Sequence, residues 1–567
     1  MSLRRKTRKL FKNPSLFFSD FMLNRNIELK NIKNNISSVE EISTSSTDTS
    51  KSKPKPKETK TIKTTKSSKK IFSRVAIGNV GDTFYLRLTE CCKNMNIPFM
   101  TGAAPDQWMH GIHINKDDIL IFSKLLEFWF SGNNKYFIRY KNNTYSLKEA
   151  LLKKEFYAQE SFDILCVENE FKDPKNHIEC YYSSIISVMI WKKLDNYSTE
   201  VIYSICTKNK YIHRLREHTF NYYMQNNCRI NDSDNVSDIT FPIDVVYTWV
   251  DGSDAEWRAQ KENYSLNKNG IRNEDVSEID EEHDDANAGR AFSDERFRNR
   301  NELLYSLRSL ELYAPFVRNI YIVTSGQRPE WLNEQSGRIK IISHDEIYEN
   351  KEHLPTFNSS GIETQLHHIP GLSEHFLYLN DDFMFADFCT PDDFFYPNGI
   401  MKFFPSESRA YEEDIDDSRE EYLIADRNAI HLLKKHSNKT SRMIMKHAPY
   451  PCSKSYLFEL ENRYKDAFVK CAENRFRDPT DIRPIAFMQY NFGYYDGKAI
   501  QSYISNRYLA LYKDTIKEQL NGVYENRKFK TICINDVGLD DDKVESVNKI
   551  THDFLEAYFP IKSSFEK

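Results

Sequence analysis

The chain has 567 residues, of which 40% are hydrophobic and 13% aromatic, and its formal net charge is −4. This length predicts about three or four domains, with enough apolar side chains for sizeable cores. The chain has no basic stripe interleaved with aromatic residues, so its charge balance does not indicate a nucleic-acid-binding protein. No apolar run approaches the ~20 residues that cross a bilayer, and we expect neither a transmembrane helix nor a signal peptide.

The first 70 residues are expected to precede the folded body. Residues 1–30 are basic and amphipathic, and predict a short helix from about Pro14. Such a helix can lie on an anionic membrane, at the inner face of the plasma membrane; packing on its own domain, or a frayed end, is an equal alternative. Residues 31–70 include a run of Ser, Thr, Lys and Pro at 43–70, which predicts a disordered linker.

Residues 71–240 predict an accessory α/β domain. Residues 74–82 are typical of a strand that ends in a glycine turn, and helical spacing follows at 85–97 and 117–130. The Gly78 and Gly81 pair lacks the third glycine of a dinucleotide loop and the lysine of a P-loop, so a strand-to-helix turn is the favoured interpretation. The ten cysteines form no Cys-x-x-Cys pair, which argues against zinc and for reduced thiols in a cytoplasmic protein.

Residues 241–567 predict the catalytic domain. Buried strands are expected at 241–250, 319–327, 338–343 and 375–385, with a helix at 301–317 and an acidic loop or lid at 261–295. Strands that alternate with helices predict a doubly wound, mainly parallel sheet. Such sheets bind ligands beyond the carboxyl ends of their strands, so the polar turns after these strands are expected to converge on one crevice.

Two of these turns carry carboxylates. Asp251 and Asp254 flank Gly252 directly after the first strand, where they can hold Mg²⁺ or a ribose, although the motif alone is more typical of a plain Asp-Gly turn. Asp381 and Asp382 interrupt the apolar run 375–385, where burial is costly unless the acids are paired or bound to metal. Alternation along a strand sends these two side chains to opposite faces.

Two further segments offer groups for phosphate. Ser360 directly precedes a predicted helix that carries Glu363 and whose N-terminus can bind phosphate, whereas the adjacent His367 and His368 are interpreted as structural. His447 lies in a proline-bounded loop, and an arginine cluster follows. The cluster comprises Arg475, Arg477 and Arg483. Arginines make bidentate phosphate contacts, and a set of surface ion pairs is the alternative.

Four blocks of this chain resemble, in order, the Stealth family of sugar-1-phosphate transferases. The family includes bacterial capsular polysaccharide phosphotransferases and the animal lysosomal-enzyme N-acetylglucosamine-1-phosphotransferase. The blocks lie at 243–254, 296–385, 446–495 and 533–566, and residues 9–25 are also similar to the start of the capsular members. The resemblance implies transfer of hexose 1-phosphate from a UDP-sugar to a hydroxyl of a glycan or lipid-linked glycan in capsule or exopolysaccharide synthesis, with release of UMP and with Mg²⁺ or Mn²⁺ as cofactor.

The resemblance also implies roles for individual residues. His447 would be the general base, Arg477 would bind the donor phosphates with Arg475 as the alternative, and Asp254 would complete the catalytic set. Metal ligands would come from Asp251, Asp381, Asp382 and Asp536, with Asn535 beside them. The substrate would contact Asp244, which also supports its strand, Trp249, Gly252, Ser360, Glu363 and Arg475.

Two other functions are compatible with these residues. An ordinary metal-dependent glycosyltransferase would use Asp381 and Asp382 as its metal-binding acids and would release UDP. A non-catalytic carbohydrate-binding scaffold would retain the fold without turnover. The intact acids, His447 and the arginine cluster argue against the scaffold.

Overall fold

The computed structural model describes residues 71–75, 81–102, 110–132, 135–141, 143–172, 178–194, 201–205, 209, 211–230, 235–268, 299–412, 421–536, 539 and 543–567. The predicted N-terminal helix, the linker at 31–70, Gly78 and most of the acidic loop at 261–295 lie outside the described residues. None of the described helices is long and apolar enough to cross a membrane.

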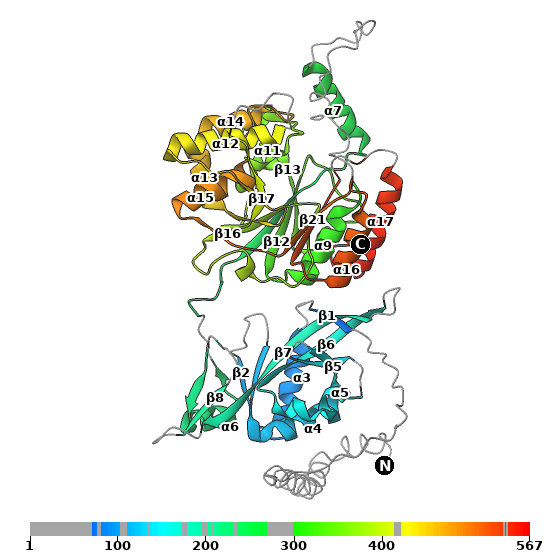
Figure 1. Cartoon of the computed structure of the whole chain (residues 1–567), viewed down its shortest axis with the longest axis vertical. Helices are drawn as coiled ribbons and strands as arrows, with labels where there is room; N and C mark the ends of the chain where they lie inside the picture. Colours follow the sequence, from blue (N-terminus) through cyan, green and yellow to red (C-terminus); the bar gives the residue numbers. More distant parts are fainter. Residues whose placement is uncertain are drawn as a thin grey trace, which may run out of the picture. The chain divides into compact units, whose positions relative to one another are not determined.

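Residues 71–230 form a ten-stranded mixed sheet with helices (Figure 1). Its strands are β1 (Ile71–Val75), β2 (Met100–Gly102), β3 (His110–Asn115), β4 (Tyr136–Tyr140), β5 (Asn143–Ser146), β6 (Ser161–Lys172), β7 (Ile178–Leu194), β8 (Ile202–Ile205), β9 (Arg214–Arg216) and β10 (Arg229–Ile230). The helices are α3 (Gly81–Asn94), α4 (Ile119–Phe130), α5 (Leu147–Leu152) and α6 (Glu217–Gln225). The main strand order is β10-β2-β3-β7-β6-β4-β5, which confirms an α/β unit.

A five-stranded sheet organises residues 241–567. It consists of β11 (Ile243–Thr248), β12 (Val317–Thr324), β13 (Ile339–Ser343), β14 (His375–Asn380) and β19 (Tyr450–Ser453). The strand order is β13-β12-β11-β14-β19, in which only the β14–β19 pair is antiparallel. Five of the six residues of β11 are buried, as expected for a strand covered on both faces. The predicted mainly parallel α/β sheet is confirmed.

Helices flank this sheet on both sides (Figure 1). The helices of this part are α7 (Ala255–Lys268), which projects away from the sheet in Figure 1, α9 (Glu302–Tyr313), α10 (His344–Ile347), α11 (Ser359–Glu363), α12 (Glu421–Ser437), α13 (Lys454–Arg463), α14 (Lys465–Glu473), α15 (Gln489–Asp496), α16 (Ile516–Asn526) and α17 (Val544–Tyr558). Helix α9 ends just before Pro315, because the residue before a proline is disfavoured in helical conformation. Figure 1 shows α9, α16 and α17 on one flank and α12 to α15 on the other.

The order of the parallel strands reverses at β11. The chain runs outward from β11 through β12 to β13, and then returns to add β14 on the opposite side of β11. A crevice at such a reversal, beyond the carboxyl ends of the two strands, is where open α/β sheets bind ligands. The segments that follow β11 and β14 are residues 249–254 and 381–382.

The predicted strand at 375–385 is wrong in one respect. Strand β14 ends at Asn380, Asp381 and Asp382 form a turn, and the chain enters a second sheet as β15 (Phe383–Phe385). There β15 pairs with β22 (Thr531–Asn535), which pairs with β21 (Asn506–Ala510). The turn places both acids between two sheets, rather than on opposite faces of one strand, and Oδ1 of Asp382 is buried there. Two small two-stranded sheets complete this part, β16 (Met401–Phe403) with β20 (Ala499–Gln501) and β17 (Pro405–Arg409) with β18 (Met443–Met445).

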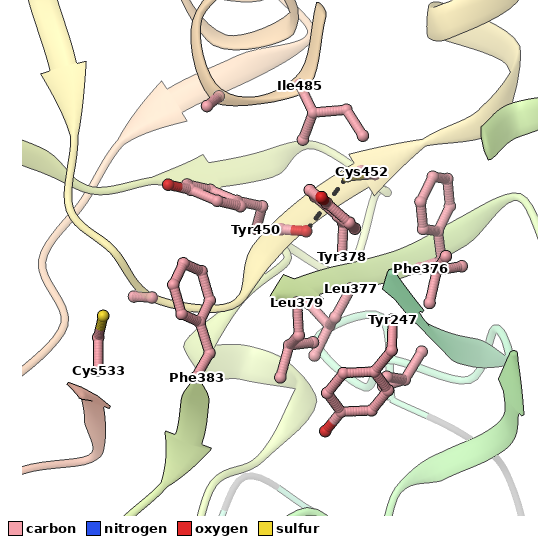
Figure 2. Packing of buried hydrophobic residues seen from close by; sticks show 14 of the residues in the cluster. Tyr247, Phe376, Leu377, Tyr378, Leu379, Phe383, Tyr450, Cys452, Ile485 and Cys533 are labelled. Atoms are coloured by element: carbon pink, nitrogen blue, oxygen red, sulfur yellow. Dashed lines mark hydrogen bonds between the residues drawn. The ribbon is translucent and has the colours of Figure 1, made fainter. Parts of the chain in front are cut away.

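The core of this part includes Phe383, the residue that follows the two acids. Figure 2 shows Tyr247, Tyr378, Tyr450 and Phe383 packed together, with Cys533 beside Phe383. The rings of Phe383 and Tyr450 are 5.6 Å apart between centroids, and Tyr378 and Tyr450 are 6.2 Å apart. Because such interiors are close-packed, the turn between β14 and β15 is held on a rigid base.

Candidate functional site

The segments that follow β11, β12 and β14 lie together at one edge of the sheet. Thr248 pairs with Asn380, so residues 249–254 and 381–382 leave the sheet at the same edge. Gln327, after β12, accepts a hydrogen bond from the backbone N–H of Asp251 at 3.0 Å and donates to its carbonyl at 2.9 Å. The predicted convergence of these turns is therefore present for the segments after β11, β12 and β14.

Both acids of the Asp-Gly turn have local partners. Oδ1 of Asp251 accepts from the backbone N–H and the hydroxyl of Ser253, at 2.9 and 2.6 Å. Oδ1 of Asp254 accepts from the N–H of Trp257 at 2.9 Å, where α7 begins, and this bond is the main reason that the pKa of Asp254 is lowered. These bonds are those of a capped turn, and both acids and Gly252 stay partly exposed at this edge of the sheet.

A cluster of carboxylates lies deeper at the same edge. Burial raises the pKa of Asp382 to about 7, and the nearby charges of Glu302 and Asp536 add to this. The pKa of Asp381 is raised well above its ordinary range by burial, and then by Glu302, Asp382 and Asp536. Glu302, at the start of α9, also has a raised pKa because it is buried. We call Glu302, Asp381, Asp382 and Asp536 the acid cluster.

One arginine partly compensates the acid cluster. Arg300 forms an ion pair through Nη1 with Asp536 and a hydrogen bond through Nε with Asn548. Its backbone N–H donates to Glu302 at 2.6 Å. The buried Nη2 of Arg300 and the buried Oδ1 of Asp382 make no hydrogen bond among the described residues. The unpaired guanidinium nitrogen can donate to an anionic group of a ligand, and the unpaired carboxylate oxygen can bind a cation that accompanies it.

His447 lies beside the acid cluster. Its Nδ1 is 4.0 Å from the sulfur of Cys533, whose thiol donates to Oδ2 of Asp382 at 3.2 Å. The amide of Asn506 donates to the carbonyl of His447 at 2.9 Å and fixes the loop. Burial lowers the pKa of His447 to about 4, and the positive charge of Arg483 adds to this. The imidazole is therefore neutral at pH 7.

A second group of charges includes Arg483, whose positive charge acts on His447. Arg483 forms an ion pair with the fully buried Asp426 at 3.1 Å. The pKa of Glu363 is raised to about 7, first by burial, although Arg483 and Arg477 oppose the rise. Oε2 of Glu363 makes no hydrogen bond among the described residues. Arg477 reaches Ser359 at 3.4 Å and remains partly exposed. Burial raises the pKa of Tyr450, and charges of both groups also act on it: Arg483 lowers this pKa, whereas Glu363 and Asp382 raise it.

The other arginine of the cluster has a structural environment. Arg475 donates to the carbonyls of Pro355 and Glu352, at 2.9 and 2.7 Å, and its guanidinium stacks on the ring of Tyr264. These contacts occupy both terminal nitrogens. The prediction that Arg475 binds substrate is therefore not supported by its geometry, whereas Arg477 projects toward α11.

Three other predicted substrate residues are engaged within the protein. Asp244 is fully buried at the opposite end of β11 from Asp251, and Arg318 forks onto its two oxygens at 2.8 and 2.6 Å. Trp249 is 7% exposed and packs in the core. The N–H of Ser360 donates to the Asn358 side chain, and α11 spans only five residues, too short for the predicted phosphate-binding helix terminus. We assign Asp244 and Trp249 to the fold.

The predicted metal ligands are only partly brought together. Asp381, Asp382 and Asp536 share the acid cluster, whereas Asp251 is held in its turn. Among the described residues, the group of three ligand atoms that lie within 4.8 Å of one another is His367, His368 and Glu461. Their hydrogen bonds of 3.0 and 3.1 Å agree with the structural role predicted for the two histidines. The acid cluster therefore fits a cation by its charge and its unpaired oxygen, but its oxygens do not form a closed coordination shell.

Several residues of the site were not predicted from the sequence. They are Arg300, Glu302, Asp426, Tyr450 and Cys533. Acids such as Glu302 are common in the first turn of a helix, so this position does not indicate a site. A single cysteine such as Cys533 belongs to no recognisable motif. Their placement depends on contacts between segments that are far apart in the chain, which no local pattern shows.

Comparison with known proteins identifies four matching family regions. Stealth protein conserved region 1 matches residues 241–269, region 2 matches 296–403, region 3 matches 446–492 and region 4 matches 521–567. Every site residue predicted from the sequence falls within one of them. The resemblance to the Stealth proteins is confirmed.

Similar proteins carry consistent names. The exopolysaccharide phosphotransferase SCO6023 of Streptomyces coelicolor is 39% identical over 330 residues, which are 58% of this chain and 53% of that protein. The capsular polysaccharide phosphotransferase SacB of Neisseria meningitidis serogroup A is 33% identical over 374 residues, 64% of this chain and 65% of that protein. The chain thus spans about half to two thirds of these relatives. A crystal structure of the galactosyltransferase LgtC with donor and acceptor sugar analogs overlaps 57% of this chain and 97% of its own, at 10% identity and a TM-score of 0.28.

Proposed function

We propose that this chain, which carries the four Stealth conserved regions, transfers hexose 1-phosphate from a UDP-sugar to a hydroxyl of a glycan or lipid-linked glycan. The product is a phosphodiester and the leaving group is UMP, as a step in capsular or exopolysaccharide synthesis. The observation that carries the proposal is that neutral His447 lies beside the acid cluster, with Nδ1 4.0 Å from the Cys533 sulfur that donates to Asp382, and within the influence of the Arg483 charge. Phosphoryl transfer requires such positioning and charge stabilisation more than covalent catalysis.

The roles follow from these positions. His447 would accept the proton of the acceptor hydroxyl, whose oxygen then forms a bond to the sugar-linked phosphorus while the bond from this phosphorus to the oxygen of UMP breaks. A neutral imidazole is competent to accept a proton at pH 7. Arg477 and Arg483 would neutralise the charge on the phosphate oxygens. Binding of phosphates beside Arg483 would also raise the pKa of His447 from its low value.

A divalent cation fits the acid cluster. Asp381, Asp382 and Asp536 would hold Mg²⁺ or Mn²⁺, because these hard cations prefer carboxylate oxygens. When bound, the cation would supply positive charge to the donor diphosphate. The raised pKa values of Asp381 and Asp382 mean that both acids resist ionisation together unless a cation joins them.

The product distinguishes this function from ordinary glycosyl transfer. The full chain is incubated with a panel of UDP-sugars, Mg²⁺ and oligosaccharide primers, and the released nucleotide is separated chromatographically. We expect UMP, together with a phosphodiester signal in the phosphorus NMR spectrum of the product. Release of UDP with a glycosidic product would establish a glycosyltransferase instead.

Association with the inner face of the plasma membrane through residues 1–30 is part of the proposal, and loss of vesicle binding after removal of these residues would test it.

A further inference from the structure

Exposed tyrosines surround β21 and the helix before it. They are Tyr494, Tyr495, Tyr503, Tyr508 and Tyr512, with exposed fractions from 41% to 76%. Large aromatic side chains left in solvent commonly mark a binding surface when they gather in one place. Tyr508 differs from the rest because it contacts His447, with ring centroids 5.0 Å apart and an edge-to-face angle of 70°.

The sheet β15-β22-β21 places Tyr508 on the same face as the proposed base. Phe383, Cys533 and Tyr508 are direct neighbours across its three strands. Each of them contacts His447: the Phe383 ring lies 6.0 Å away between centroids, the Cys533 sulfur is 4.0 Å from Nδ1, and Tyr508 lies at 5.0 Å. His447 therefore rests on this face, with Asp382 on the inner side of Cys533 and Tyr508 on the outer edge strand.

Three contacts attach the tyrosine segment to the histidine loop. Nζ of Lys446 donates to the carbonyl of Ile504 at 3.1 Å and lies 4.4 Å from the ring centroid of Tyr503. Asn506 donates to the carbonyl of His447 at 2.9 Å and to the hydroxyl of Thr531 at 3.0 Å. These bonds hold the exposed rings of Tyr503 and Tyr508 at a fixed place relative to the imidazole.

We propose that Tyr508, with Tyr503 on the segment that precedes β21, forms the subsite for the acceptor glycan. This inference rests on the proposed function. An aromatic ring offers an apolar face that matches the C–H face of a pyranose, so a sugar seated on Tyr508 presents its hydroxyl to His447. In an in-line displacement the attacking and leaving oxygens lie on opposite sides of the phosphorus. With the donor phosphates assigned to the cation at the acid cluster and to Arg477 and Arg483, the exposed ring that contacts His447 is that of Tyr508.

The position of Tyr508 in the chain agrees with this assignment. It falls between conserved regions 3 and 4, which match 446–492 and 521–567, whereas His447 and the acid cluster lie inside the matched regions. A subsite outside the shared regions is expected for the part of the reaction that differs among proteins that build different polysaccharides. The aromatic face thus determines which acceptor is used, not whether transfer occurs.

Steady-state kinetics with Tyr508→Ala test the subsite. The acceptor is the member of a panel of hexose and N-acetylhexosamine trisaccharides that most stimulates UMP release by the unmodified full chain. We expect the acceptor KM to rise ~5- to 10-fold, the order for one lost aromatic contact. Acceptor-independent UMP release, with water as nucleophile, and the donor KM should stay within twofold. Tyr508→Phe should retain the wild-type acceptor KM, and Tyr495→Ala, which removes an equally exposed ring on α15, should change nothing.

The alternatives give different results. An unchanged acceptor KM in Tyr508→Ala, with the unmodified chain still stimulated by acceptor, would overturn the subsite and leave the transferase intact. A rise in donor KM would instead place the ring against the nucleotide. Equal loss of hydrolysis and transfer, without a change in acceptor KM, would show that Tyr508 only supports His447. If no saccharide stimulates UMP release, the glycan acceptor itself is refuted.

Discussion

The thiol of Cys533 donates to Oδ2 of Asp382 at 3.2 Å, across the gap between β22 and the turn that follows β14. This bond fixes one oxygen of the carboxylate and leaves the buried Oδ1 without a hydrogen bond among the described residues. The same sulfur lies 4.0 Å from Nδ1 of His447. Cys533 therefore sets the distance between the proposed base and the proposed cation site.

Removing the charge of Asp382 should make the metal-free protein more stable at alkaline pH. The folded pKa of Asp382 is about 7, above its ordinary value near 4, so its stabilising contribution is complete at low pH and is lost as the pH rises through 7. We expect the unfolding temperature without Mg²⁺ to fall from pH 5.5 to pH 8, and Asp382→Asn to reduce that fall.

Added Mg²⁺ should reverse this trend. The cation favours the ionised carboxylate, so its stabilisation of the native chain should grow between pH 6 and pH 8, and Asp382→Asn should weaken it. Calorimetry with and without Mg²⁺ measures both effects. Asp466→Asn, which alters an exposed acid on α14, serves as the control. The same pH slope in the wild type and in Asp382→Asn would refute the assignment.

The sequence predicted the sheet well because its strands are continuous apolar runs. The runs at 241–250 and 319–327 became β11 and β12 within a few residues. The run at 375–385 could not be interpreted fully, since alternation along the chain does not show that the strand stops at Asp381 and that its continuation joins another sheet. Only the pairing of β15 with β22, more than a hundred residues later, determines that break.

The site was predicted mainly through the family resemblance, and its electrostatics were not predictable. His447 was identified by its block, but its lowered pKa depends on burial and on Arg483. Asp244 was grouped with the substrate residues because it belongs to the same family block as Asp251. The structure places its carboxylate at the other end of the strand, under Arg318. Residues that are close in sequence are far apart in space when an extended strand separates them, because each residue of a strand adds about 3.3 Å.

Replacing His447 should strongly reduce turnover and leave donor binding intact. With His447→Gln we expect turnover to fall by ~10²-fold or more, because a general base typically contributes that much. The donor KM should change little, since the phosphates are assigned to other side chains. Turnover and KM for UDP-sugar measure the two effects, and His436→Gln, a histidine at the end of α12, is the matched control. A His447→Gln variant with normal turnover would remove this residue from the mechanism.

Two arginines two residues apart should behave differently. Arg477→Ala should lower kcat/KM for the donor by ~10²-fold, as expected when a group that stabilises developing charge is lost. Arg475→Ala should instead lower stability by about 1–3 kcal/mol, because it leaves the carbonyls of Pro355 and Glu352 without their donor. Donor kinetics and denaturant unfolding of both variants separate the roles. Impaired catalysis by folded Arg475→Ala would return Arg475 to the phosphate site.

Asp244 tests the division between fold and site most directly. Its oxygens accept from Arg318 and from the backbone N–H groups of Asn319 and Ser373, at 2.6 to 3.1 Å. Asp244→Ala leaves these donors unpaired, and we expect a loss of about 3–5 kcal/mol in the free energy of unfolding, the range for breaking a buried pair. Activity per folded molecule should be unchanged, because the residue lies at the far end of β11 from Asp251.

Arg318→Ala is the matched control, since the Arg318 side chain is 44% exposed. It should lower the free energy of unfolding by less than Asp244→Ala, because the two backbone donors keep their bonds to Asp244. Urea unfolding at pH 7 and kinetics below the transition measure both quantities. A stable Asp244→Ala protein with a raised donor KM would show that this carboxylate contacts substrate after all.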